Sequence, residues 1–270
     1  MRTNQLAHPE NDLPVIVIGA GPIGLAAAVQ LHARGQAALV LEAGVGVGTS
    51  VRSWGHVRLF SPWRYLVDPA ARRLLDAHGW RAPDPESHPT GAELVGRLLE
   101  PLAALPEVAP ALRFEHRVIA VTRLGFDRLK TTGRDQAPFQ VVAEGPDGEH
   151  RLLARAVIDA TGTWTGPNPL GSGGVPAAGE RAHVARISYR VPDVLGIERW
   201  AYAGMRTLVV GSGHSAFNAV IDLAELARQE DGGEVVWAVR RQQPGQMFGG
   251  ARTPRQVSRG WARRSRSRRC

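Results

Sequence analysis

Three glycines and one acid near the N-terminus carry the clearest chemical signature in this chain. Gly19, Gly21 and Gly24 form the spacing G-x-G-x-x-G, and Glu42 follows 18 residues after Gly24. In a nucleotide-binding turn the first glycine allows the tight turn, the second lets a pyrophosphate approach, and the third lets a helix pack against a strand. A carboxylate at Glu42 could accept hydrogen bonds from both ribose hydroxyls and would repel a 2′-phosphate. The spacing therefore predicts a dinucleotide site.

The segments around these residues are those that such a site needs. Residues 15–18 are an apolar β-branched run typical of a buried parallel strand, and residues 37–42 are a second such run that ends in Glu42. A helix is expected to begin near Pro22. Pyrophosphate would bind at its N-terminus, where unpaired N–H groups and the helix dipole favour an anion. A glycine turn with a purely structural role is the simplest alternative.

The same stretch permits two further interpretations. Residues 14–31 are nearly all apolar, as a membrane span or a signal peptide would be. Glu10 and Asp12 directly precede the stretch and no cleavage pattern follows it, which argues against both. We therefore expect a soluble, cytoplasmic chain without a membrane partner.

The segment after Glu42 combines glycines with aromatic and cationic side chains. Gly48 would let this loop pass close to the ligand that Glu42 binds. Trp54 and Arg58 are residue types that suit a planar, electron-poor ring system. An ordinary loop packed by its own aromatic residues is an equally good interpretation.

A second glycine turn follows a predicted β-meander. Residues 113–121 and 139–153 have strand patterns, with a hairpin turn at 146–148. Residues 156–158 then read as a buried parallel strand that leads into Asp159, Ala160, Thr161 and Gly162. This turn should lie at the carboxyl ends of the sheet, where ligands bind in open α/β folds. Asp159 could alternatively serve only to cap the turn.

The order of these motifs resembles a known family. The unit "GAGPIG" with its acid, the meander and then "DATG" are similar to the FAD domain of flavoproteins with two dinucleotide-binding domains. That group includes flavin-containing monooxygenases and pyridine nucleotide disulfide reductases. The resemblance implies FAD as the cofactor of the first unit.

A second nucleotide unit begins about 190 residues after the first. Its strand is residues 207–210, its turn holds Gly211, Gly213 and Ala216, and its second strand, residues 234–239, ends at Arg240 and Arg241. Two arginines, in the place of an acid, favour a 2′-phosphate, so we expect NADPH here. His214 and Ser215 would line the pyrophosphate, unless Ser215 only caps the helix.

Further motifs favour the monooxygenase branch. Gly179 and His183 have the G-x-x-x-H spacing of flavin-containing monooxygenases, although Ala177 and Ile187 stand where that group has aromatic residues. The segment Thr161-Gly162-Thr163-Trp164 also resembles a segment of the flavin-containing monooxygenases. The resemblance implies that NADPH reduces FAD and that the reduced flavin transfers an oxygen atom from O₂ to a small molecule. It assigns no catalytic side chain.

Composition limits the remaining possibilities. Residues 251–270 hold eight arginines and no acid, so the other residues have 33 − 8 = 25 basic against 25 acidic residues, and the net charge of +8 lies in this tail. We expect the tail to be disordered and nucleic-acid binding to be absent. Cys270 is the single cysteine, which excludes an internal disulfide or a C-x-x-C redox pair. No metal site is expected among the nine histidines.

These observations predict an α/β fold with two Rossmann-like three-layer nucleotide-binding domains and a small antiparallel β-meander. We place the FAD domain at residues 1–165, a partial NADP domain at 166–250 and the basic tail at 251–270. The second domain is expected to be incomplete, because a return segment to the first sheet is missing after residue 241. A truncated, non-catalytic nucleotide-binding fragment is therefore the alternative to an active oxidoreductase.

Overall fold

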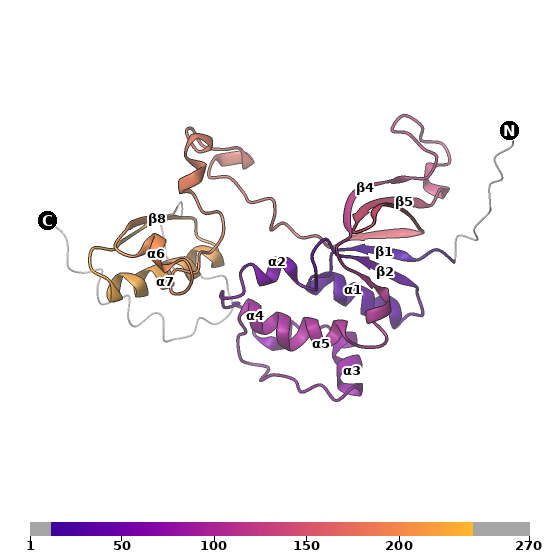
Figure 1. Ribbon diagram of the computed structural model, residues 1–270, viewed down its shortest axis with the longest axis horizontal. Coiled ribbons are helices and arrows are strands. Elements are labelled where there is room, and N and C mark those ends of the chain that lie inside the picture. The colour runs from indigo at the N-terminus through magenta and orange to yellow at the C-terminus, as the bar shows by residue number, and fades with distance from the viewer. Residues whose placement is uncertain (1–11, 240–270) are drawn as a thin grey trace. The chain divides into compact units, whose positions relative to one another are not determined.

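The structure is a computed structural model that describes residues 12–239. The chain divides into two units, and the boundary follows Arg181. The sequence analysis placed this boundary after residue 165. Each unit is described by itself below, with the element labels of Figure 1.

The first unit is built on a parallel sheet of four short strands. The order is β3-β2-β1-β7, and every neighbouring pair is parallel. Apolar residues make up most of β1, β2 and β7 because both faces of the sheet are covered. Ile18, at the carboxyl end of β1, pairs with Leu41 of β2 and with Asp159 of β7. The strands are β1 (Val15–Ile18), β2 (Ala38–Leu41), β3 (Leu112–Arg113) and β7 (Ala156–Asp159).

Helices cover one face of this sheet. Val17 and Val40 point into a core that these helices complete, as expected for alternate residues of a strand. Asp68 caps α3, and Thr90 with Glu93 forms a capping box at α4. The helices are α1 (Pro22–His32), α2 (Thr49–Arg52), α3 (Pro69–Ala77), α4 (Gly91–Leu94) and α5 (Glu100–Ala103), with a π-helical turn at Val95–Leu99.

An antiparallel meander covers the opposite face. Ile16 and Leu41 pack there against Val141, Ala143 and Ala154 of the meander. The unit therefore has three layers, helices, parallel sheet and meander, and Figure 1 shows the outer two on opposite sides of β1 and β2. The meander strands are β4 (Arg117–Arg123), β5 (Phe139–Gly145) and β6 (Gly148–Ala154). The predicted meander and its hairpin are confirmed.

The second unit contains one strand, helix, strand repeat. Strands β8 (Arg206–Val210) and β9 (Glu234–Ala238) are parallel, and α7 (His214–Gln229) connects them. Leu223 and Leu226 of α7 pack on the sheet. A short helix, α6 (Arg199–Tyr202), precedes β8. The predicted α/β class and the predicted strand, helix, strand order of this unit are confirmed.

The remaining helical segments are short. The 3₁₀ turns are Trp63–Tyr65, Ala109–Ala111, Arg134–Gln136, Ser172–Gly174 and Arg181–Arg186. Of the helices between residues 12 and 239, none is both long and apolar enough to cross a membrane.

Candidate functional site

Two of the three glycines in the first turn are required by the fold itself. Gly19 has φ +99°, and a Cβ there would lie 2.8 Å from the Ala160 carbonyl oxygen. A Cβ on Gly24 would lie 1.9 Å from the Gly19 carbonyl oxygen. The close approach of α1 and of the 159–162 turn to this backbone therefore excludes any side chain at either position.

The second glycine of the turn, Gly21, is not required by a lack of room for a side chain. Gly21 has φ −77° and ψ −173°, which any residue can adopt. Within the described chain, no atom lies within 4 Å of where its Cβ would be. Gly21 is the N-cap of α1, and Pro22 begins the helix. The open space lies at the N-terminus of an 11-residue helix, where N–H groups and the dipole attract an anion, so the site fits a pyrophosphate.

The Glu42 side chain is hydrogen-bonded to the backbone of the glycine turn. Its carboxylate is buried, and it accepts hydrogen bonds from the N–H of Ala20 at 2.7 Å and from the N–H of Gly44 at 2.8 Å. The N–H of Gly48 in turn donates to the Ala20 carbonyl at 3.0 Å. Glu42 therefore positions the turn, a role that the sequence analysis did not include.

The second turn lies at the same edge of the sheet. Asp159 pairs with Ile18, and the Ala160 N–H donates to the Ile18 carbonyl at 2.9 Å. The hydroxyl and N–H of Thr161 donate to Asp159 Oδ1 at 2.7 and 3.0 Å. These hydrogen bonds hold the pKa of the Asp159 carboxyl below its ordinary value. Asp159 thus caps the turn, which passes through Gly162 at φ +70°.

The aromatic and cationic residues of the 43–65 segment have contacts within the protein. The Trp54 ring packs over Gly91, where a Cβ would lie 2.8 Å from it, and its centroid is 6.5 Å from that of Trp164. Arg58 donates to the His88 carbonyl at 2.5 Å, and its guanidinium lies 4.0 Å from the Glu93 carboxylate. Their predicted contact with a ligand ring stays a prediction.

The turn of the second unit likewise lies between a parallel strand, β8, and the start of a helix, α7. Gly211 has φ +120°, and the N–H of the Trp237 ring donates to its carbonyl at 2.7 Å. Gly213 is the N-cap of α7, and no described atom lies within 4 Å of a Cβ at Gly211 or Gly213. His214 begins the helix, so Ser215 is its second residue and not its cap. The small Ala216 is buried. Arg240 and Arg241 lie outside the described residues.

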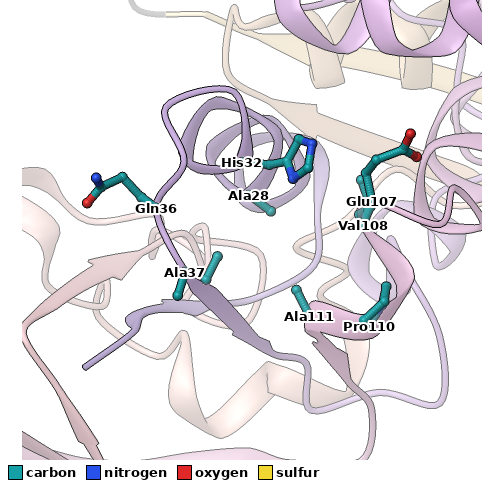
Figure 2. A pocket seen from close by; sticks show the side chains of 9 residues that line it. Ala28, His32, Gln36, Ala37, Glu107, Val108, Pro110 and Ala111 are labelled. Atoms are coloured by element: carbon teal, nitrogen blue, oxygen red, sulfur yellow. The ribbon is translucent and has the colours of Figure 1, made fainter. Parts of the chain in front are cut away.

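A pocket of about 250 Å³ lies elsewhere on the first unit (Figure 2). Ala37 and Ala38 place it at the amino end of β2, and His32 contributes from the end of α1. The opposite edge of the sheet, with the turns of Gly19, Gly21 and Gly162, is called the glycine edge below. Glu107 accepts from, or pairs with, His78 at 2.9 Å, and its second oxygen has no hydrogen-bond partner among the described residues. None of the predicted site residues lines this pocket.

One side-chain group was missed by the sequence analysis. His116, Asp147 and His150 offer ligand atoms that all lie within 4.8 Å of one another, at one end of the meander. The spacing Asp147-x-x-His150 across the hairpin turn is the one local signal of this group in the sequence.

The fold and the glycine turns have the arrangement that a dinucleotide site requires, and the chain is similar to known flavoproteins. Residues 14–117 match the family model for FAD-dependent oxidoreductases. Flavin-containing monooxygenase FMO GS-OX-like 2 from Arabidopsis thaliana is 24% identical over 251 residues, which are 83% of this chain and 50% of the relative. An indole-3-pyruvate monooxygenase from Oryza sativa is 29% identical over 232 residues, 78% of this chain and 45% of the relative.

Solved structures give the same result. A flavin-containing monooxygenase from Stenotrophomonas maltophilia matches with a TM-score of 0.55 and 26% identity, over 85% of this chain and 58% of that one. The chain spans about half the length of the curated relatives that it matches. The chain is thus similar to flavin-containing monooxygenases, and its first 117 residues include the match to FAD-dependent oxidoreductases.

Proposed function

We propose that this chain binds FAD at the glycine edge of the first unit and NADPH at the turn of the second. The reaction is the reduction of the flavin by NADPH, followed by oxygen transfer to a small molecule. The observation that carries the proposal is the open space at Gly21, the glycine that the fold does not require. The FAD-dependent oxidoreductases and monooxygenases among its relatives support the same assignment.

The glycine edge would bind the pyrophosphate and the adenosine ribose. The first-turn N–H groups of α1, which begins at Pro22, would donate to phosphate oxygens. Glu42 would accept from a ribose hydroxyl while it retains Ala20 and Gly44, because each carboxylate oxygen has more than one acceptor position. Its negative charge would disfavour a dinucleotide with a 2′-phosphate.

The turn of residues 159–162 would complete this site from the neighbouring strand. The Asp159 carboxylate accepts hydrogen bonds from the Thr161 hydroxyl and N–H. These bonds fix the backbone of residues 159–161. Gly162 then allows the chain to turn close to the ligand. Gly48, Trp54 and Arg58 would border the ring system.

The second unit would bind NADPH through its own helix N-terminus. Gly211 and Gly213 leave space in front of α7, which begins with His214 and Ser215. Arg240 and Arg241 would pair with the 2′-phosphate of NADPH. The bound flavin would accept the hydride and react with oxygen, and the protein would orient and shield it.

The cytoplasmic location expected from the sequence stays a prediction.

The test is the visible absorbance spectrum of the gently purified full chain, followed by release and identification of the flavin. We expect an oxidised flavin spectrum and released FAD. A colourless protein that also takes up no added FAD would overturn the assignment of the first unit.

Addition of NADPH without oxygen tests the second unit. We expect the flavin absorbance to bleach, faster with NADPH than with NADH, and to return when oxygen is admitted. A chain that retains FAD but is bleached by neither nucleotide would be a flavin-binding module without the reductive half-reaction.

A further inference from the structure

Two histidines and an aspartate gather at one end of the meander, where the His116 N–H donates to the Glu42 carbonyl at 2.9 Å. His116 directly precedes β4, Asp147 lies in the turn between β5 and β6, and His150 lies in β6 opposite Ala143. Their ligand atoms all lie within 4.8 Å of one another. Imidazole nitrogens with a carboxylate oxygen are a common ligand set for divalent transition metals.

The ring of His116 is held in the orientation that a metal ligand needs. Its Nδ1 lies 2.7 Å from the carbonyl oxygen of Phe114. A carbonyl can only accept a hydrogen bond, so Nδ1 carries the hydrogen, and Nε2 of the neutral ring keeps its lone pair. Donation from the second ring nitrogen to a carbonyl is the usual way in which proteins orient a metal-binding histidine.

Gly145 provides the space in which the two rings converge. A Cβ on Gly145 would lie 2.8 Å from Nε2 of His150 and 3.0 Å from Nε2 of His116. The two ring centroids are 5.0 Å apart, with an interplanar angle of 35°. Both Nε2 atoms therefore point to one spot, which a larger residue at position 145 would fill.

Asp147 supplies the third ligand atom. Its Oδ1 lies 2.8 Å from Nε2 of His150. Ligands about 2.1 Å from a tetrahedral ion lie about 3.4 Å apart, so a small rotation of Asp147 would admit the ion between them. The Asp147 side chain is 76% exposed and lies in a turn, so this rotation meets little resistance.

We propose that His116, Asp147 and His150 bind a divalent transition-metal ion of the Zn²⁺ class, with a remaining coordination position open to water. The ion would link the start of β4 to the β5–β6 hairpin. Its role would be to stabilise the meander, which packs against Ile16 and Leu41 of the parallel sheet. The proposal is independent of the nucleotide sites.

The test is titration of the untagged, chelator-treated full chain with Zn²⁺ alone, followed by calorimetry, and with Co²⁺, followed by its visible d–d absorption. We expect one ion per chain and a rise in melting temperature on binding. Asp147→Asn and His150→Asn should each lower the affinity at least about tenfold, and Gly145→Ala should do so with all three ligands present.

Two control variants locate the ion. Asp135→Asn makes the same change at the opposite end of the meander, in the segment between β4 and β5, and should leave affinity unchanged. Cys270→Ser should also leave it unchanged. No binding by the wild-type chain, or equal binding by all the variants, would overturn the proposal. In the first case the group is only an ion pair of His150 with Asp147.

Discussion

The carboxylate of Glu42 accepts a hydrogen bond of 2.7 Å from the N–H of Ala20, 22 residues earlier in the chain. This bond links the end of β2 to the turn that follows β1. The Gly44 N–H binds the other carboxylate oxygen at 2.8 Å. One side chain therefore sets the shape of the glycine turn and also carries the negative charge proposed to meet the ribose.

Replacement of Glu42 by alanine should impair both stability and FAD binding. The N–H groups of Ala20 and Gly44 would lose their acceptor in a buried place, at a cost of about 2 kcal/mol or more in the free energy of unfolding. Urea denaturation and FAD titration measure the two effects. The control is Glu100→Ala, which removes a half-exposed ion pair with Arg52 and should change stability by less than about 1 kcal/mol. Equal stabilities of the two variants would contradict the role assigned to Glu42.

Alanine at the second and third glycines of the turn should have different effects. Gly24→Ala places a Cβ 1.9 Å from the Gly19 carbonyl oxygen, so α1 must shift, and we expect a loss of about 3 kcal/mol of stability. Gly21→Ala meets no described protein atom and should melt like the wild type, but it should bind FAD at least about tenfold more weakly.

Thermal melting and FAD titration separate these two outcomes. Gly96→Ala is the matched control, because the nearest atom to its Cβ is a Glu100 carboxylate oxygen at 3.7 Å. FAD affinity should not change, and the melting temperature should not fall, because alanine favours the helical turn more than glycine does. Normal FAD affinity in Gly21→Ala would show that the open space is not the pyrophosphate site.

Asp68 should stabilise the first unit in a pH-dependent manner. Burial acts to raise the pKa of its carboxyl, but hydrogen bonds from the Ala71 N–H, the Gln30 side chain and the Ala70 N–H outweigh burial and lower the pKa. A lowered pKa in the folded state means that the stabilisation is present above the ordinary value of 3.8. It is lost as the pH falls through the folded-state pKa.

Asp68→Ala should therefore cost about 1 kcal/mol at neutral pH, and the difference from the wild type should shrink below about pH 4. Chemical denaturation across this pH range measures it. Asp76→Ala on the same helix is the control, since Asp76 forms an exposed pair with Arg72 at 2.7 Å and should contribute less than about 0.5 kcal/mol. A pH-independent difference would show that the cap acts without its charge.

Arg240 and Arg241 should determine the preference for NADPH. Changing both to serine removes the predicted pairs with the 2′-phosphate, so NADPH affinity should fall at least about tenfold while NADH affinity stays the same. Nucleotide titration of the flavin-loaded protein measures both. Arg228→Ser, at an exposed residue near the end of α7, should alter neither affinity. An equal loss for NADH and NADPH would assign these arginines a role other than cofactor choice.

Much of the architecture could be predicted because its signals are local. The run "VIVI", the glycine spacing and the acid at the end of β2 all fall within about 30 residues, and the structure pairs Ile18 with Leu41 as a parallel sheet requires. The hairpin at 146–148 was equally predictable, because turn residues separate two strand patterns.

The unpredicted features depend on contacts between distant residues. Arg58 reads in the sequence as a cation near an aromatic cluster, but its guanidinium lies against the His88 carbonyl, 30 residues away. His116 and His150 converge only because β4 and β6 flank β5 and because Gly145 has no side chain. The sequence pattern cannot show that His116 and His150, 34 residues apart, meet in the space left by the missing Cβ of Gly145.

The place of β7 beside β1 has a consequence for the order of events during synthesis. Val15 pairs with Ala156, so the glycine edge lacks one side until some 140 further residues have been made. Until then one edge of β1 is unpaired, and an apolar strand of that kind readily pairs with other chains. Variants that slow the folding of the meander should therefore reduce the yield of soluble protein during expression, even when the molecules that mature bind their ligand normally.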